Sequence, residues 1–244
     1  FTRTKRSVTL TETGHYLLGE VDFILNHLEH VLRSAELIAN GEEGELRVGF
    51  VGSAMHDFLP GLLKNLNVNY PGIRTSLDQL SNKEQIESID DDRIDIGFIR
   101  TLSVPAGFER LQVKKDTFSL VVPQDHFLNQ KNYQSVKQLE KEDFIFFSRN
   151  YSYDYFELII SIFQDQGFTP KVINRSVDLN TIFRLVENKM GLAIVPSVLK
   201  MGFDLDIRFI ELKNVPQRTI LSAVWKESNR NPVLPKFLDL VKAI

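Results

Sequence analysis

Residues suited to binding a small anion stand at the ends of two predicted strands in this 244-residue sequence. Ser53 and Ala54 follow the strand-like run ELRVGFV, and Arg100 ends the run IDIGFI. Backbone N–H groups at the start of a helix attract negative charge, and a guanidinium can hold a carboxylate through two parallel hydrogen bonds. This set of residues therefore predicts a binding site for an organic anion.

Two further strand-to-helix turns carry the same kinds of side chain. Ser81 and Asn82 follow one predicted strand, and Ser148 and Arg149 follow the run FIFF, with Tyr153 close behind. Taken singly, each serine or asparagine is better explained as an ordinary helix cap. Their recurrence at corresponding strand ends favours a ligand, and the tyrosine ring would suit a ligand with an apolar or aromatic body.

Sequence patterns typical of an enzyme or a metal site are absent from the sequence. There is no glycine-rich phosphate loop, no Gly-x-Ser-x-Gly turn and no His-Glu-x-x-His helix. Ser53 and His56 lie three residues apart, but no third group that would orient the base can be identified. His27 and His30 have the spacing of helical metal ligands, yet they lie on a polar flank. We therefore expect no catalytic residue, no metal and no cofactor.

The composition is that of an ordinary globular protein. Hydrophobic residues make up 43% of the chain and charged residues 25%, and the formal net charge is -3. The surface as a whole is therefore unsuited to a polyanion, so any contact with nucleic acid should be local. With no cysteine and no apolar run of about 18 residues, we expect neither disulfides nor a membrane segment, and we expect a cytoplasmic protein.

Residues 15–41 carry a heptad pattern. Apolar side chains recur at alternating spacings of four and three residues, which places them along one side of a helix. An amphipathic helix packed on its own domain is the alternative, but about 40 Å of helix is too long to be covered by its neighbours. The pattern favours a dimerisation helix with a seam formed by Leu17, Val21, Ile24, Leu28 and Val31.

Strands and helices alternate after this helix, and their order is repeated. Phe50 and Phe147 end equivalent strands 97 positions apart, and Ile96 and Ala193 lie in equivalent strands with the same offset. A repeat of this kind predicts two similar α/β lobes of about a hundred residues rather than one large sheet.

The predicted architecture is α/β, with two Rossmann-like lobes joined by two crossover strands. We expect the first lobe to comprise residues 45–115 and 208–244, and the second to comprise residues 116–207, with the return crossing at 202–207. A chain that leaves one lobe and later returns to it forms a cleft between the two, where ligands of open α/β sheets bind.

Several stretches together resemble the LysR-type transcriptional regulators. The opening FTRTKRSVTLTETG is similar to the end of that family's winged helix-turn-helix, and a long linker helix follows it. The runs GELRVGFVGSAMHDFLPGLL, RIDIGFIR, LVVPQDHFL and MGLAIVP resemble its two-lobed effector-binding domain, which is of the periplasmic-binding-protein type. The resemblance implies that residues 1–14 are a remnant of the DNA-binding domain, in keeping with a chain that opens on Phe1.

The resemblance also implies a function. A LysR-type regulator is a DNA-binding transcription factor, not an enzyme, and a homodimer or homotetramer controlled by a small organic-acid effector. Its partners would be promoter DNA, contacted in the wing by Arg3, Lys5 and Arg6, and further copies of itself. A solute-binding protein for small organic anions is the alternative, although the basic wing and the heptad seam argue against it.

The nature of the effector stays open at this point. Family members that bind aromatic acids or muconate place a serine, a threonine and an arginine where Ser53, Asn82 and Arg100 stand here, so the middle position departs from their pattern. The run GFVGSAMHDFLP also resembles an acetoin-operon regulator that responds to small acids such as acetate.

Overall fold

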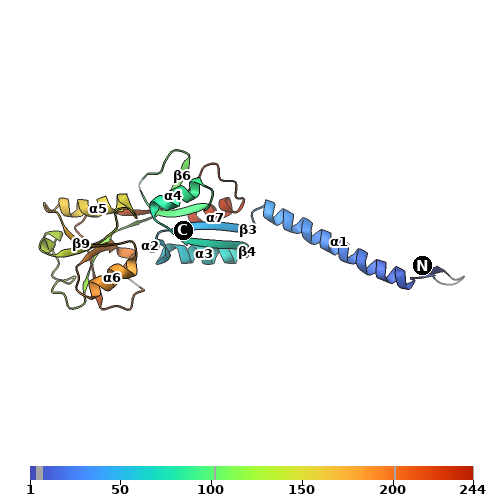
Figure 1. The fold of residues 1–244 in the computed structure, drawn as a ribbon, viewed down its shortest axis with the longest axis horizontal. Helices are drawn as coiled ribbons and strands as arrows, with labels where there is room; N and C mark the ends of the chain where they lie inside the picture. The colour runs from blue at the N-terminus through green and yellow to red at the C-terminus, as the bar shows by residue number, and fades with distance from the viewer. Residues whose placement is uncertain (4–7, 102, 201, 244) are drawn as a thin grey trace.

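The computed structural model describes residues 1–3, 8–101, 103–200 and 202–243, without the side chains of Arg3 and His30. A long helix, α1 (Glu12–Ala39), stands clear of a body made of two lobes (Figure 1). Each lobe combines a β-sheet with helices packed against it (Figure 1). The predicted α/β architecture with two lobes is confirmed.

Both ends of α1 are determined by local sequence. The Thr11 side chain accepts a hydrogen bond from the Gly14 backbone N–H at 3.0 Å, which caps the first turn. Gly41 follows the C-cap with a φ of 69°, a conformation that glycine adopts readily. A side chain at Gly41 would also collide with the carbonyl oxygen of Pro232. The end of α1 therefore lies against the start of α7 (Val233–Lys242) in the first lobe.

The segment before α1 contains two short strands. Strands β1 (Thr2–Arg3) and β2 (Val8–Thr9) pair in antiparallel fashion, and the Val8 side chain is 61% exposed. Strand β2 is thus solvent-exposed. Lys5 and Arg6 lie outside the described residues, as does the Arg3 side chain.

The first lobe contains a five-stranded sheet in the order β4-β3-β5-β12-β6. Its first three strands are parallel to one another, and β12 runs antiparallel to both β5 and β6. Parallel strands end at the same edge, which is how this lobe brings residues that follow them together. The strands are β3 (Glu43–Phe50), β4 (Gly72–Gln79), β5 (Ile96–Arg100), β6 (Phe108–Asp116) and β12 (Thr219–Lys226), and the helices besides α7 are α2 (Gly52–Met55), α3 (Phe58–Asn69) and α4 (Asn82–Asp90).

The second lobe repeats this arrangement. Its strands form the runs β10-β7-β11 and β8-β9, and a parallel bridge between Phe144 and Leu192 links β8 to the segment that leads into β10. The resulting order β9-β8-β10-β7-β11 corresponds to that of the first lobe. The strands are β7 (Phe118–Pro123), β8 (Asp143–Phe147), β9 (Lys171–Ser176), β10 (Ala193–Pro196) and β11 (Ile207–Glu211), with helices α5 (Tyr153–Gln164) and α6 (Leu179–Glu187) and short 3-10 turns at η1 (Val136–Leu139) and η2 (Ser197–Lys200).

The offset of 97 residues holds in detail. Strands β3 and β8 end at positions 97 apart, as the sequence predicted, and helices α4 and α6 begin 97 apart. Their caps correspond too, because Ser81 caps α4 and Asp178 caps α6. Even the two non-glycine residues with positive φ, Asp92 at 54° and Lys189 at 60°, are equivalent. Residues of the two lobes can therefore be compared position by position.

Two local expectations are wrong. Residues 208–211 were expected in the first lobe, but β11 pairs with β7, and Leu212 still donates a hydrogen bond to the Phe118 carbonyl. The chain therefore returns to the first lobe between Leu212 and Thr219, not at 202–207. The expected turn after β3 is instead the short helix α2.

Each lobe has its own hydrophobic core. Phe98 and Phe237 are fully buried in the first lobe, and Phe144 and Phe183 are fully buried in the second. These cores are separate clusters, so the two lobes can shift relative to each other without disrupting either core. Tyr151 of the second lobe packs against the first-lobe core at the edge of the cleft.

Candidate anion-binding site

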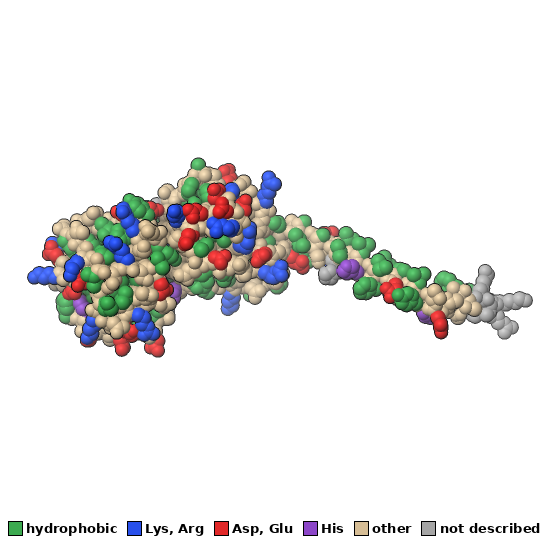
Figure 2. Space-filling view, in the orientation of Figure 1, with side chains coloured by type: hydrophobic (Ala, Val, Ile, Leu, Met, Phe, Trp, Pro, Cys, Tyr) green, Lys and Arg blue, Asp and Glu red, His purple; other side chains and the backbone are tan. Residues whose placement is uncertain are grey.

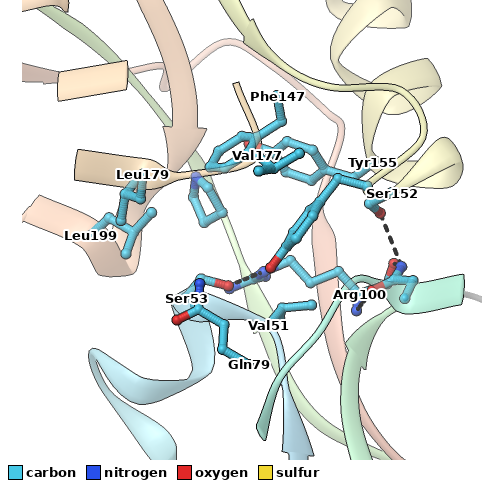
Figure 3. A pocket seen from close by; sticks show the side chains of 14 residues that line it. Val51, Ser53, Gln79, Arg100, Phe147, Ser152, Tyr155, Val177, Leu179 and Leu199 are labelled. Atoms are coloured by element: carbon cyan, nitrogen blue, oxygen red, sulfur yellow. Dashed lines mark hydrogen bonds between the residues drawn. The ribbon is translucent and has the colours of Figure 1, made fainter. Parts of the chain in front are cut away.

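Arg100 lies between the two lobes, at the end of β5. Its Nε donates a hydrogen bond to Ser53 Oγ at 2.8 Å (Figure 3), and its Nη1 donates to Thr219 Oγ1 at 3.1 Å. Ser53 follows β3 in α2, and Thr219 begins β12, so three neighbouring strands of the first-lobe sheet position this group. Ser53 and Arg100 are therefore in direct contact, as predicted.

The Arg100 guanidinium is a buried charge without a carboxylate partner. The residue is 8% exposed, and no ion pair within 4.0 Å joins it to any acidic residue in the described part of the chain. Burial lowers the pKa of Arg100 from its ordinary value, while the charges of Asp116 and Asp57 act in the opposite sense. A buried cation of this kind is unfavourable unless an anion compensates it.

A cavity of about 50 Å³ adjoins Arg100 between the lobes (Figure 3). Both lobes contribute to its wall, and apart from the arginine the lining is apolar, aromatic or neutral polar. A water molecule needs roughly 10–15 Å³ on this measure, so the cavity holds about three to five atoms of that size. Its lining residues are Val51, Gly52, Ser53, Gln79, Asn82, Arg100, Phe147, Tyr151, Ser152, Tyr155, Val177, Leu179, Pro196 and Leu199.

Asn82 joins the two lobes at the edge of the cavity. Its Nδ2 donates both to the Arg100 carbonyl at 2.8 Å and to Ser152 Oγ at 2.9 Å, while its backbone N–H donates to the Tyr151 carbonyl. Thr101 Oγ1 makes a second link, donating to Asp154 Oδ2 at 2.8 Å. These hydrogen bonds hold the lobes in a closed arrangement around the cavity.

Two tyrosines of the second lobe close the cavity further. Tyr155 is buried and donates its hydroxyl hydrogen to the Ile194 carbonyl, and burial raises its pKa. Burial also raises the pKa of Tyr151, against the lowering effect of the Gly52 backbone and the Gln79 side chain, which its hydroxyl faces. Both phenols therefore remain neutral and add no negative charge beside Arg100.

Five of the predicted site residues lie elsewhere. Ala54 belongs to the first-lobe core, and the Ser81 hydroxyl is taken up by the capping box of α4. Ser148 is absent from the cavity lining. Arg149 forms an ion pair with Glu157 at 2.7 Å and stacks on the Tyr153 ring at 4.7 Å, and both line an outer groove between the lobes.

Sequence reasoning missed Thr219 and the apolar half of the cavity. Thr219 is separated from Arg100 by 119 positions, and no sequence signal indicates that β12 pairs beside β5. Leu179 could have been found, because it is the equivalent of Asn82 at the offset of 97. Leu199 and Val177 have no such signal.

The predicted seam on α1 is uncovered in the single chain. Leu17, Val21, Ile24, Leu28 and Val31 are each between 41% and 60% exposed, and apolar side chains lie along the visible face of the helix (Figure 2). Leu18, Leu25 and Leu32 add an adjoining exposed column, one residue after the seam positions. A stripe this wide is costly in water unless another chain covers it.

The described residues lack the features of two other classes of protein, those that span a membrane by a helix and those that hold a metal ion in a cluster of side chains. No helix among them combines the length and apolar character that crossing a membrane requires. Nor do the described His, Asp and Glu side chains form a group of three or more that could hold a metal ion.

Comparisons with known proteins agree on one family. A family model described as the LysR substrate binding domain matches residues 39–244. The regulator ClcR of Pseudomonas putida is 30% identical over 99% of this chain and 82% of its own length. The structure of CbnR, a LysR family transcriptional regulator, has a TM-score of 0.86 and 22% identity over 98% of this chain and 83% of its own. The BenM effector binding domain with its effector benzoate has a TM-score of 0.69 and 21% identity over 82% of this chain and 90% of its own.

Proposed function

Because the chain belongs to the LysR family of transcriptional regulators, we propose that its interlobe cleft binds a small organic acid and that this binding controls transcription. The buried Arg100 guanidinium carries this proposal. It lies at the carboxyl end of parallel strands and lacks a carboxylate partner among the described residues. A carboxylate entering the cavity would supply the missing negative charge through charge-assisted hydrogen bonds.

Ser53 and Asn82 assist this role in different ways. Ser53 Oγ accepts its hydrogen bond from Arg100, which leaves the hydroxyl hydrogen to donate to a carboxylate oxygen. The Asn82 side chain donates one hydrogen bond to the backbone carbonyl of Arg100, which positions that residue, and another to Ser152 Oγ of the second lobe. The benzoate bound to the BenM domain, which shares this fold, is an organic acid as well.

The ligand acts on the fold only if it binds the closed and open forms with different affinity. Arg100 and Ser53 belong to the first lobe, while Tyr151 and Ser152 reach the same cavity from the second. A ligand that touches both sides therefore favours closure, and the separate cores allow the lobes to move. We infer that closure changes the placement of paired DNA-binding domains.

The exposed seam of α1 supplies the pairing. Two copies packed along Leu17, Val21, Ile24, Leu28 and Val31 would remove this surface from water, as in a two-stranded coiled coil. The adjoining column of leucines suits contacts with further chains, so a homotetramer is in keeping with it. A solute-binding protein for organic anions would have no use for such a helix.

The wing would add contacts to promoter DNA. Arg3, Lys5 and Arg6 are the basic residues of this segment, and by themselves they would confer affinity that depends on salt and not on sequence.

Gene expression in cells tests this function. We expect that adding the cognate acid changes transcription of the target genes in cells carrying the intact gene, and that Arg100→Met abolishes the response. Arg74→Met serves as the matched control, since Arg74 is exposed on β4, is absent from the cavity lining and makes no side-chain hydrogen bond or ion pair with the described residues. Equal responses from the Arg100→Met variant and the intact protein would overturn the proposal.

A further inference from the structure

The two halves of the cavity differ in character at equivalent positions. Asn82 of the first lobe corresponds to Leu179 of the second at the offset of 97, and both line the cavity. Arg100 corresponds to Ser197, whose hydroxyl is engaged with Thr117 at 2.9 Å and Ser119 at 2.8 Å. At these two positions the first lobe therefore has an amide and a cation, whereas the second has hydrocarbon and a neutral hydroxyl.

Among the described residues, Arg100 is the one charged side chain that lines the cavity. The polar side chains that the second lobe adds to this lining are neutral: Ser152 accepts from Asn82, Tyr155 donates to the Ile194 carbonyl, and the Tyr151 hydroxyl faces Gly52 and Gln79 of the first lobe. The rest of that wall is apolar and is formed by Phe147, Val177, Leu179, Pro196 and Leu199. A second carboxylate on the ligand would face this wall without a cationic partner.

From this asymmetry we infer that the cleft selects a short-chain aliphatic monocarboxylate. The carboxylate binds Arg100 and Ser53 on the first lobe, and the hydrocarbon tail packs against Val177, Leu179 and Leu199 of the second lobe (Figure 3). This inference rests on the proposed function and narrows its ligand class.

The size of the cavity supports an aliphatic chain over a ring. At about 50 Å³ it accommodates roughly three to five atoms of water size, which matches acetate or propionate. An aromatic acid has about twice that number of atoms, so it would have to separate the lobes. Separation would break the hydrogen bonds from Asn82 to Ser152 and from Thr101 to Asp154.

Calorimetry on the full 244-residue chain tests the inference with four probes: propionate, butyrate, succinate and benzoate. We expect propionate and butyrate to bind, and succinate to bind at least about 100-fold more weakly because its second carboxylate loses water without gaining a partner. Benzoate should bind more weakly than propionate. If succinate or benzoate binds the chain as tightly as propionate, the inference is wrong while the proposed function stands. If none of the acids binds, the proposed function fails with it.

A charge introduced at Val177 provides a gain-of-function test. Val177 lines the cavity and is 54% exposed, so a lysine there can be accommodated without burying its charge in the core. We expect Val177→Lys to tighten succinate binding at least about tenfold by pairing the second carboxylate. Val177→Met, of similar bulk but neutral, should leave succinate binding unchanged, and circular dichroism checks that both variants fold. No gain with Val177→Lys, or an equal gain with both variants, would contradict the placement of the tail.

Discussion

Replacing Arg100 by methionine should separate binding from stability. The guanidinium donates two hydrogen bonds, to Ser53 at 2.8 Å and to Thr219 at 3.1 Å. Hydrogen bonds from a charged group contribute about 1.5–3 kcal/mol each, or about 3–6 kcal/mol together. Taking an ion out of water costs several kcal/mol, and no carboxylate in the described part of the chain offsets this cost. The two contributions nearly cancel.

We therefore expect Arg100→Met to change the free energy of unfolding by less than about 2 kcal/mol. Effector affinity should instead fall by about 2–5 kcal/mol, which is roughly 30-fold to 4,000-fold in Kd, because one member of a buried charge pair is removed. Urea denaturation measures the first quantity, and calorimetry with propionate measures the second.

The matched control is Arg74→Met, which removes an exposed arginine from β4 and should alter neither quantity appreciably. A loss of more than about 4 kcal/mol in unfolding free energy for Arg100→Met would mean that the guanidinium serves mainly to hold the sheet edge together. An unchanged Kd would refute its assignment to the effector.

Three other perturbations have defined outcomes. Arg47→Met should destabilise the chain by about 2 kcal/mol at neutral pH, because the nearly buried Asp95 loses hydrogen bonds from a half-exposed partner. Burial tends to raise the pKa of Asp95, but the hydrogen bonds from Arg47 outweigh this effect, so the pKa of Asp95 is lowered overall. The stabilisation by this pair is thus present above the unfolded pKa of about 3.9 and is lost as pH falls through the folded value. The free energies of unfolding of Arg47→Met and of the unaltered protein, measured with urea, should therefore converge in acid. Leu28→Lys should turn the dimer into a monomer in sedimentation, and a variant that stays dimeric would exclude the seam. Thr101→Val removes the hydrogen bond to Asp154 and should weaken propionate binding about fivefold to 30-fold by disfavouring closure, whereas unaltered affinity would show that this contact does not control it.

Local patterns predicted the parts of the fold that depend on short stretches of sequence. The seam of α1 follows from the spacing of Leu17, Val21 and Ile24, and the repeat of the lobes follows from equivalent strand ends. The meeting of Ser53 and Arg100 was predictable as well, because β3 and β5 are adjacent parallel strands and end at the same edge of one sheet.

Long-range pairing explains most of what the sequence did not reveal. Thr219 reaches Arg100 because β12 pairs between β5 and β6, and β11 joins the second lobe because it pairs with β7. Such pairings depend on packing throughout the core, whereas the turn signals that can be read from sequence depend only on neighbouring residues. Arg149 was lost from the site for a different reason, since the nearby Glu157 and Tyr153 hold it outside the cavity.

Determining the structure of the chain crystallised with propionate tests the central claim most directly. We predict a carboxylate between the lobes, with its oxygens within about 3 Å of the Arg100 guanidinium and of Ser53 Oγ, and the hydrocarbon tail toward Leu179. Propionate bound outside the cleft would contradict the claim, and so would an acidic side chain of the protein itself that forms an ion pair with Arg100.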